Sequence, residues 1–320
     1  MDILSEVIAA VRTGRPSAVA RALTQPWGLR WYRSSSARFH VVLQGSAELM
    51  PGAAGAGGQA PGDASLLTLA PGDIVLLPHG QEHALAGDGG MEWRDVMPVP
   101  DGVEPHWPPT TWHTDGIDAV IMTGTIPLDL SRAHPLFAQL PPVIHLRRDL
   151  GVPRSLGAAV ELLAIELEEA EIGWDTIVAG LLDTVLLYIL RAWWLRERPG
   201  SELDRGWAAA LRDPAVGAAL QAIHRQPALS WTVEKLAAES GLSRAVFAQR
   251  FTTMVGSPPV AYLTWWRMTQ AGRLLLQDHA PLQTIAERVG YASEFAFARA
   301  FKRDYGIAPG LYRARGRQLI

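Results

Sequence analysis

The chain has 320 residues, no cysteine and a formal net charge of −3. The length suits two or three domains, and the absence of thiols excludes disulfides, cysteine nucleophiles and thiolate metal sites in this sequence. The charge is uneven: residues 231–320 carry 12 Lys and Arg against 6 Asp and Glu, whereas the remainder carries 17 against 26. A basic last third on an acidic remainder predicts one anion-binding domain.

No segment has the pattern of a secretory signal or a membrane span. Residues 2–11 have the spacing of an amphipathic helix, with Ile3, Val7 and Val11 on one face. We expect this helix to pack against the body of the protein or a partner subunit. The most apolar stretch, residues 177–194, is interrupted by Asp183. The sequence therefore predicts a cytoplasmic protein with no membrane partner.

From Trp27 onward, apolar and polar residues alternate with a period of two, which predicts strands. We expect strands at residues 29–31, 39–43, 65–69, 73–77, 91–96 and 119–123. Residues 51–63 are rich in Gly and Ala and are expected to form a loop. Short strands between Gly and Pro turns predict a small barrel or sandwich.

Residues 72–83, GDIVLLPHGQEH, specify the barrel further. Their Gly, Pro-x-Gly and His spacing resembles the second signature of cupin barrels, and residues 39–49, with Gly45 at a turn, resemble the first. Residues 5–145 thus resemble the ligand-binding cupin half of arabinose-type regulators. This resemblance implies a small-molecule effector inside the barrel. The alternative is a barrel interior that is filled by side chains. The expected ligand-binding residues are Trp31, His40, His79, His83 and Trp93.

Metal-binding cupins add an His-x-His pair and a Glu from the first segment. Here that segment offers only His40, and Arg38 stands near the position expected for the Glu. Three other imidazoles, those of His79, His83 and His113, are the candidate ligands for a divalent metal. The alternative is that His79 and His83 line the ligand pocket or hydrogen-bond within a turn. No other cofactor is predicted.

Residues 155–171 and 174–198 predict a helical hairpin. Its second helix has more apolar residues than one face of an exposed helix needs, Leu181 and Val185 among them. One interpretation packs the excess on the barrel. We prefer a second, in which the hairpin also pairs with its copy in a homodimer, because excess apolar surface marks an interface. We therefore assign residues 146–200 to a dimerisation hairpin, with a linker at 199–202.

The last third of the chain contains an internal repeat. Residues 232–263 and 282–313 each read as a helix, a glycine turn and a second helix that begins at a serine. A shift of 50 positions matches four residues of the first unit to identical residues of the second: Phe251, Gly256, Pro259 and Tyr262 to Phe301, Gly306, Pro309 and Tyr312. Two helix-turn-helix units are predicted, with a scaffold helix at 213–226 and a linking helix at 260–277.

This tandem resembles the DNA-binding domain of the AraC/XylS family. In the second unit the matching residues are Gly290, Tyr291, Ser293, Phe297, Arg299, Phe301, Lys302, Gly306, Pro309, Tyr312 and Arg313. The resemblance implies a transcription regulator that binds double-stranded DNA through residues 207–320. It leaves RNA polymerase open as a further partner.

Recognition helices are expected at residues 243–253 and 293–304. Side chains in their first two turns that face away from the phenylalanines can reach base edges in the major groove. We expect DNA contacts from Arg244, Ala245, Ala248, Gln249, Arg250, Glu294, Phe295, Ala298, Arg299, Lys302 and Arg303. Gln249 suits adenine, Arg299 suits guanine, and Arg250 and Lys302 suit phosphate. The alternative for Arg299 is a surface ion pair with Glu294 or Asp304.

The expected fold is therefore α+β, with a cupin-like β-barrel over residues 1–145, the hairpin, and an all-α double helix-turn-helix domain. The expected function is transcription regulation under the control of a small molecule, not catalysis, because no pattern of catalytic residues stands out. Two alternatives remain open. One is a cupin metalloenzyme with a DNA-binding tail, and the other is an architectural DNA-binding protein with a vestigial sensor.

Overall fold

The computed structural model describes residues 2–52, 66–87, 97–99, 116–129, 134–196, 206–277 and 279–316. The chain forms two compact units. The barrel unit is Arg12–Glu197, and the helical unit combines Met1–Val11 with Arg198–Ile320. The loop expected at 51–63 lies mostly outside the described residues, and the strand expected at 91–96 and the linker at 199–202 lie entirely outside them.

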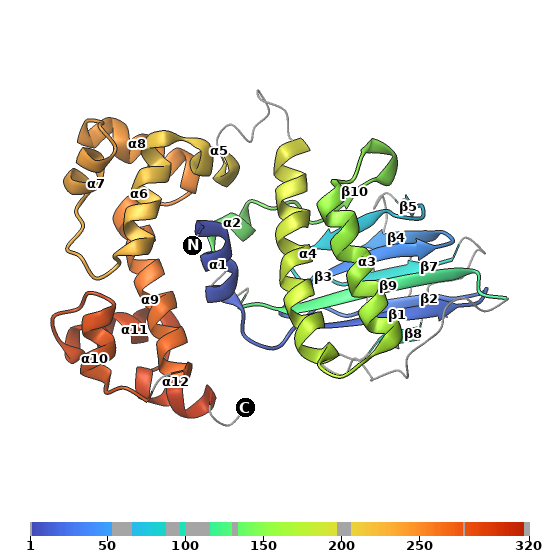
Figure 1. Cartoon of the computed structure of the whole chain (residues 1–320). Coiled ribbons are helices and arrows are strands. Elements are labelled where there is room, and N and C mark those ends of the chain that lie inside the picture. The colour runs from blue at the N-terminus through green and yellow to red at the C-terminus, as the bar shows by residue number, and fades with distance from the viewer. Residues whose placement is uncertain are drawn as a thin grey trace. The chain divides into compact units, whose positions relative to one another are not determined.

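The described strands of the barrel unit form two five-stranded sheets (Figure 1). The first sheet has the order β1 (Ser17–Leu23), β9 (Ala119–Pro127), β3 (Ser36–Gln44), β6 (Ile74–Leu77) and β10 (Ile144–Leu146). The second has the order β5 (Leu67–Leu69), β4 (Ala47–Pro51), β7 (His83–Ala86), β2 (Gly28–Trp31) and β8 (Met97–Val99). Neighbouring strands are antiparallel except β2 and β8. The predicted α+β class with a sheet-rich first part is confirmed.

The inward side chains of both sheets share one apolar core. Trp31 of β2, Val42 of β3 and Leu85 of β7 belong to it and are fully buried. Gly45 makes the turn between β3 and β4 at φ 73°, where a Cβ atom would lie 2.0 Å from the carbonyl oxygen of Asp118. Glycine is required there because both the positive φ and the close backbone exclude a side chain.

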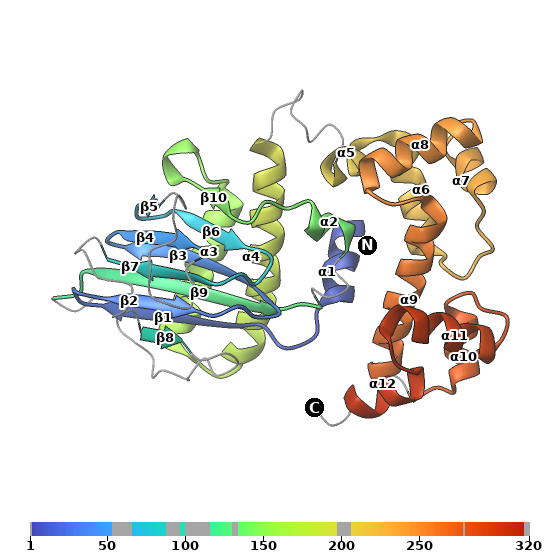
Figure 2. The ribbon, with the colours of Figure 1, turned by 180° about the vertical axis from the view of Figure 1, so that it is seen from behind.

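A hairpin of α3 (Arg154–Glu169) and α4 (Trp174–Arg196) covers the outer face of the first sheet (Figures 1 and 2). Helix α4 approaches the sheet closely, because a Cβ at Gly124 of β9 would lie 2.8 Å from Leu182 of α4. By length and composition α4 is the one described helix that could cross a membrane, and its buried residues pack inside the barrel unit.

Val185 of α4 is completely buried, so it packs within the barrel unit and is not available at an outward surface. The apolar residues of the hairpin that do face outward are Leu162, Ile165, Ile177 and Leu195.

Two short helices complete the described elements of the barrel unit. Helix α2 (Pro135–Ala138) lies between β9 and β10, and the 3-10 helix η3 (Arg148–Leu150) lies between β10 and α3. The helical unit contains α5 (Trp207–Arg212), α6 (Pro214–Arg225), α7 (Val233–Glu239), α8 (Arg244–Val255), α9 (Pro259–Gln277), α10 (Leu282–Arg288), α11 (Glu294–Tyr305) and α12 (Pro309–Gly316).

The first helix, α1 (Ile3–Val11), packs on α6 and α9 of the helical unit. We had assigned it to the barrel domain, whereas its contacts place it with the C-terminal helices. The domain boundaries at residues 145, 200 and 207 remain predictions.

A buried polar chain ties α1 to its partner helices. Tyr262 Oη lies 2.7 Å from His224 Nε2, and His224 Nδ1 lies 2.9 Å from a Glu6 carboxylate oxygen. Because a carboxylate only accepts, His224 donates to Glu6 from Nδ1 and accepts from the Tyr262 hydroxyl. Burial lowers the pKa of His224, although Glu6 opposes the shift, so the imidazole is neutral at pH 7. The ring stacks on Trp266 with centroids 3.9 Å apart.

We predict that Val7→Asp destabilises the helical unit by at least about 2 kcal/mol, because Val7 is buried and an unpaired buried charge is costly. Hydrogen exchange of the α6 and α9 amides measures the effect. Ala9→Asp, at an exposed position of the same helix, is the control and should change stability by less than about 0.5 kcal/mol. Unchanged α6 and α9 protection in Val7→Asp would show that α1 does not belong to this unit.

Candidate nucleic-acid interface and barrel site

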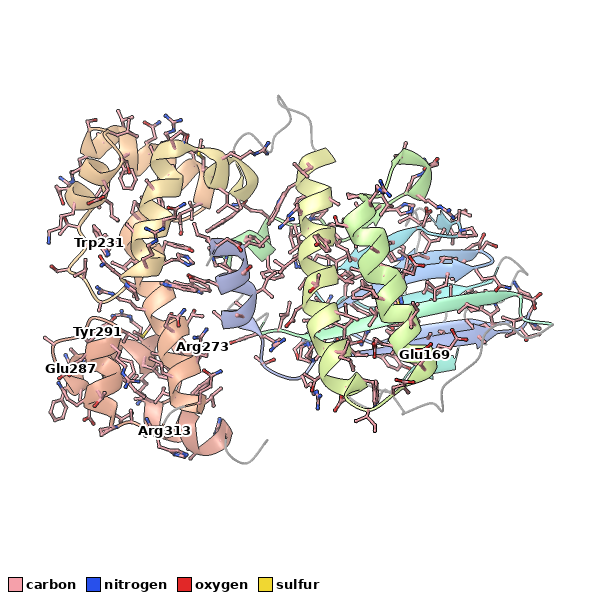
Figure 3. The ribbon with its side chains drawn as sticks, in the orientation of Figure 1. Glu169, Trp231, Arg273, Glu287, Tyr291 and Arg313 are labelled. Atoms are coloured by element: carbon pink, nitrogen blue, oxygen red, sulfur yellow. The ribbon has the colours of Figure 1, made fainter. Side chains whose placement is uncertain are left out.

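The predicted tandem of helix-turn-helix units is present in the helical unit. The first unit is α7 with α8, and the second is α10 with α11 (Figures 1 and 3). In Figure 3 the labelled side chains of Glu287 and Tyr291 lie in the second unit. The linking helix α9 has 19 residues, one more than predicted, and is about 28 Å long at 1.5 Å per residue.

The two recognition helices begin and end alike. The hydroxyl of Ser243 accepts from the Val246 amide at the start of α8, and that of Ser293 accepts from the Ala296 amide at the start of α11. Gly256 and Gly306 end these helices in the left-handed conformation, with φ 83° and 74°. The expected bounds, 243–253 and 293–304, are therefore correct to within two residues.

Equivalent aromatic contacts hold both recognition helices in place. The rings of Phe247 and Phe251 lie 5.6 Å apart at 55°, and those of Phe297 and Phe301 lie 5.7 Å apart at 55°. A tyrosine from the following helix meets the second phenylalanine edge-on in each unit, with Tyr262 in the first and Tyr312 in the second. All four phenylalanines are fully buried.

The opposite faces of these helices point to solvent. Phe295 is 83 % exposed, and Arg299 is exposed and forms no ion pair with another described residue. The other expected DNA contacts that are exposed are Arg244, Ala245, Gln249, Arg250, Glu294, Lys302 and Arg303, while Ala248 and Ala298 are half-buried.

Two arginines of the first unit have protein partners that the sequence did not suggest. Arg250 forms an ion pair with Asp213, the buried N-cap of α6. Arg244 pairs with Glu234 of α7 across 2.7 Å, with both side chains exposed. An exposed pair of this kind contributes little stability, so Arg244 can exchange its partner for phosphate at small cost.

Inside the barrel, His40, His83 and Trp31 form a compact buried cluster. His40 Nε2 lies 2.8 Å from His83 Nε2, and the Trp31 ring stacks on His83 with centroids 5.1 Å apart. These three residues, predicted together from the sequence, are thus neighbours. Trp93 lies outside the described residues.

The hydrogen bonds of the histidine pair determine its tautomers. His83 Nδ1 lies 2.9 Å from the carbonyl oxygen of Gln81, which only accepts, so His83 carries its proton on Nδ1. His83 Nε2 therefore accepts from His40 Nε2–H. His40 Nδ1 in turn accepts from the hydroxyl of Thr123 at 3.0 Å.

Burial keeps both rings neutral. It lowers the pKa of His83 to about 3, although the Gln81 carbonyl opposes the shift. Burial also lowers the pKa of His40 well below its usual value, and the neighbouring His83, Arg38 and Arg21 lower it further.

The expected metal ligands do not assemble among the described residues. His79 Nε2 binds the carbonyl oxygen of Leu140 at 2.9 Å, and His83 is paired with His40 instead. His113 lies outside the described residues, and within them no group of three or more metal-binding side chains occurs. The described residues bring the imidazoles of His40 and His83 face to face, and the three-ligand site that includes His113 stays a prediction.

Sequence reasoning missed Arg21 and Thr123 as neighbours of the histidine pair. Arg38, which the sequence already placed near the position expected for the Glu, lies two residues before His40 and so shares its face of β3. Arg21 and Thr123 required the pairing of β9 with β1 and β3, which is not visible in local sequence.

We predict that the barrel unit loses stability as pH falls from about 6.5. The two histidines bind protons in the unfolded state at this pH, whereas the folded pair stays neutral. The loss is up to about 1.4 kcal/mol per pH unit for each histidine. The free energy of unfolding, measured with denaturant at several pH values between 6.5 and 5, should therefore depend less steeply on pH in His40→Gln/His83→Gln than in the unaltered chain. His79→Gln, outside the pair, is the control, and equal slopes in all three proteins would contradict the prediction.

Each of the two units matches a known family of domains. A cupin family model matches residues 2–194, and a helix-turn-helix domain model matches residues 236–315. A putative AraC-like transcription regulator of Streptomyces lividans is 31 % identical over 320 residues and covers 98 % of each chain. The transcriptional regulator AlkR of Acinetobacter baylyi is 29 % identical over 325 residues, covering 98 % of this chain and 99 % of its own.

Among solved structures, the DNA-binding domain of AdpA in complex with a target DNA is 34 % identical, covers 33 % of this chain and 95 % of that one, and has a TM-score of 0.32. The cupin match spans more than half of the chain, and the Streptomyces relative spans nearly all of it. The chain therefore belongs to the AraC/XylS family of DNA-binding transcriptional regulators.

Proposed function

We propose that this regulator reads its operator with the N-terminal halves of α8 and α11, and that a small molecule in the barrel changes its affinity for that operator. The repeated recognition helix carries the proposal: each has buried phenylalanines on one side and exposed side chains on the other. The cupin match supports an effector in the barrel unit, near Trp31, His40 and His83.

Each exposed side chain has a role that suits its chemistry. Arg299 makes the bidentate contact to guanine, and Gln249 makes the equivalent contact to adenine. Phe295, solvent-exposed in the first turn of α11, contacts a thymine methyl group. Lys302 contacts phosphate, and Arg250 contacts phosphate with the part of its guanidinium that Asp213 does not hold.

The length of α9 supports a bipartite site. About 28 Å of helix between the units suits two successive major grooves, which lie roughly 34 Å apart along one face of the duplex. One helical unit should then protect two short blocks about 10 base pairs apart.

We predict that Arg299→Ala weakens binding by about 1–3 kcal/mol at the preferred operator and relaxes the preference at one base. Lys302→Ala should weaken binding to every sequence and reduce the salt slope by about one. The measurement is fluorescence anisotropy on a duplex selected from a random pool and on its single-base variants.

Arg154→Ala, at an exposed position of α3 in the barrel unit, is the control and should leave binding unchanged. Equal weakening of all duplexes by Arg299→Ala, or a footprint of a single block, would contradict these roles.

We also propose a homodimer through the outward face of the α3–α4 hairpin. Leu162 and Ile165 of α3 are about half-exposed and lie one turn apart, and Ile177 and Leu195 of α4 are exposed as well. Solvent-exposed apolar residues that recur on one face of a hairpin mark an interface.

Leu162→Glu/Ile165→Glu should give a folded monomer at micromolar concentration, because both side chains lie at the surface of the unit. Analytical ultracentrifugation measures the mass, and circular dichroism verifies the fold. Leu150→Glu, an exposed leucine of η3 outside the hairpin, is the control and should remain dimeric. A dimer that persists in the double variant would place the interface elsewhere.

In this proposal the protein acts in the cytoplasm, where its DNA is, and catalyses no reaction. If the protein activates transcription, RNA polymerase is its further partner. A thermal-shift screen of metabolites on the full chain, followed by operator binding with each hit, tests effector control. An affinity that no stabilising metabolite changes would favour the architectural alternative.

A further inference from the structure

The loop between α6 and α7, residues 226–231, connects the two helix-turn-helix units from the side. It leads into the first unit, and in both views it lies beside the second (Figures 1 and 2). The loop approaches Gly290, in the turn between α10 and α11, where a Cβ atom would lie 2.8 Å from both the Cα and the carbonyl oxygen of Ala228. Gly290 has a φ of 83°, so the backbone conformation and the close approach both require glycine. The turn of the second unit therefore packs directly on the loop of the first.

Arg267, near the middle of α9, holds this contact. Its Nε donates to the carbonyl oxygen of Pro227 at 2.7 Å, and its Nη2 donates to that of Leu229 at 2.8 Å. The same Nη2 atom would lie 2.7 Å from a Cβ at Gly290, and the guanidinium carbon lies 5.9 Å from the centroid of the Tyr291 ring. A guanidinium keeps its charge in proteins, so both hydrogen bonds are charge-assisted and have a fixed fork geometry. One side chain thus contacts the loop of the first unit and the turn of the second.

Other side chains fix the shape of the loop. The Trp231 indole N–H donates to the carbonyl oxygen of Gln226 at 2.9 Å, and Lys235 Nζ donates to that of Ser230 at 2.9 Å. Together with the two bonds from Arg267, side chains hold four of the carbonyl oxygens of the loop. A loop held in this way has few alternative conformations, so it can keep the second unit in one position.

The linking helix α9 does not by itself fix the angle between the two units. Its first half packs in the first unit, where Tyr262 meets Phe251, and Met268 and Leu275 of its second half belong to the core of the second unit. Long helices bend, and a bend of about 10° at one end of a helix about 28 Å long moves the other end by about 5 Å. This displacement exceeds the roughly 3.4 Å between successive base pairs. A contact from the side removes this freedom.

We infer that Arg267 is a positioning residue that holds the two recognition helices at one separation, so that the regulator accepts one spacing between the two blocks of its operator. Arg267 is half-buried and bonded to protein carbonyl oxygens, so it acts on DNA through the recognition helices. It selects the spacing of the blocks and reads no base. This inference rests on the proposed bipartite site.

The test measures how strongly binding depends on the spacing of the blocks. Full-length protein is titrated by fluorescence anisotropy with the duplex selected from a random pool, and with duplexes that have one base pair inserted or deleted between the two protected blocks. We expect the unaltered protein to bind each spacing variant at least ten times more weakly than the parental duplex. Arg267→Met should bind the parental duplex at least three times more weakly, and should lose less than threefold on either change of spacing.

A duplex with a single block separates positioning from folding. It keeps only the block at which Arg299→Ala relaxes the base preference. Arg267→Met and the unaltered protein should bind it with affinities within twofold of each other, because the core of the second unit is complete without the arginine. Loss of stability alone would instead weaken binding to all duplexes by the same factor and leave the spacing dependence unchanged.

Two further variants complete the design. Arg267→Lys, for use should Arg267→Met fail to fold, retains the charge without the fork that reaches both carbonyl oxygens, and it should lose part of the spacing dependence. Arg225→Met, at an exposed position of α6, is the matched control and should keep the parental affinity and spacing dependence.

The outcomes separate this inference from the bipartite site. If Arg267→Met and Arg267→Lys keep the parental spacing dependence, or weaken binding to all duplexes equally, the inference is overturned and the bipartite site stands. If the unaltered protein tolerates the changed spacing, or protects a single block, the bipartite site and the inference both fail. A spacing dependence that the unaltered protein shows and Arg267→Met loses would support both.

Discussion

The orientation of each recognition helix depends on a pair of phenylalanines one helical turn apart, with a tyrosine against the second ring. The centroid distances of the two phenylalanine pairs agree to within 0.1 Å, and their interplanar angles are both 55°. A buried aromatic pair has few alternative packings, because interiors are dense and rings prefer tilted geometries. The positions of Arg299 and Gln249 on the exposed faces are therefore set by buried contacts on the opposite side of the same helices.

Outside this shared core the two units differ. In the first, Tyr262 also bonds to His224, Arg250 is held by Asp213 and Arg244 faces Glu234. In the second, Tyr312 packs on Tyr305, and Arg313 donates to the carbonyl oxygen of Ala280. The first unit is thus tied to α1 and α6 by polar contacts. In the second, Arg299 and Lys302 form no ion pair with a described residue.

Much of this architecture could be predicted because its signals are local. Serine caps, glycine ends and phenylalanine spacing lie within a dozen residues of one another, so the repeat predicted both recognition helices closely. Strand β1 was missed because its alternating alanines carry weak apolar contrast. The pairing of His40 with His83, the partner of Arg250 and the buried side of Val185 depend on contacts between distant segments, which a single sequence does not encode locally.

The position of α1 has a consequence for how the protein is made. Glu6 and His224 are 218 positions apart, and α1 belongs to a unit whose other helices follow the whole barrel unit. During synthesis the apolar face of α1 stays unburied by these partners until α6 and α9 have left the ribosome. Contacts of such long sequence separation form late and slowly. Completion of the DNA-binding unit therefore requires the emergence of nearly the entire chain, so that a truncated nascent protein cannot assemble the joint between α1 and the C-terminal helices.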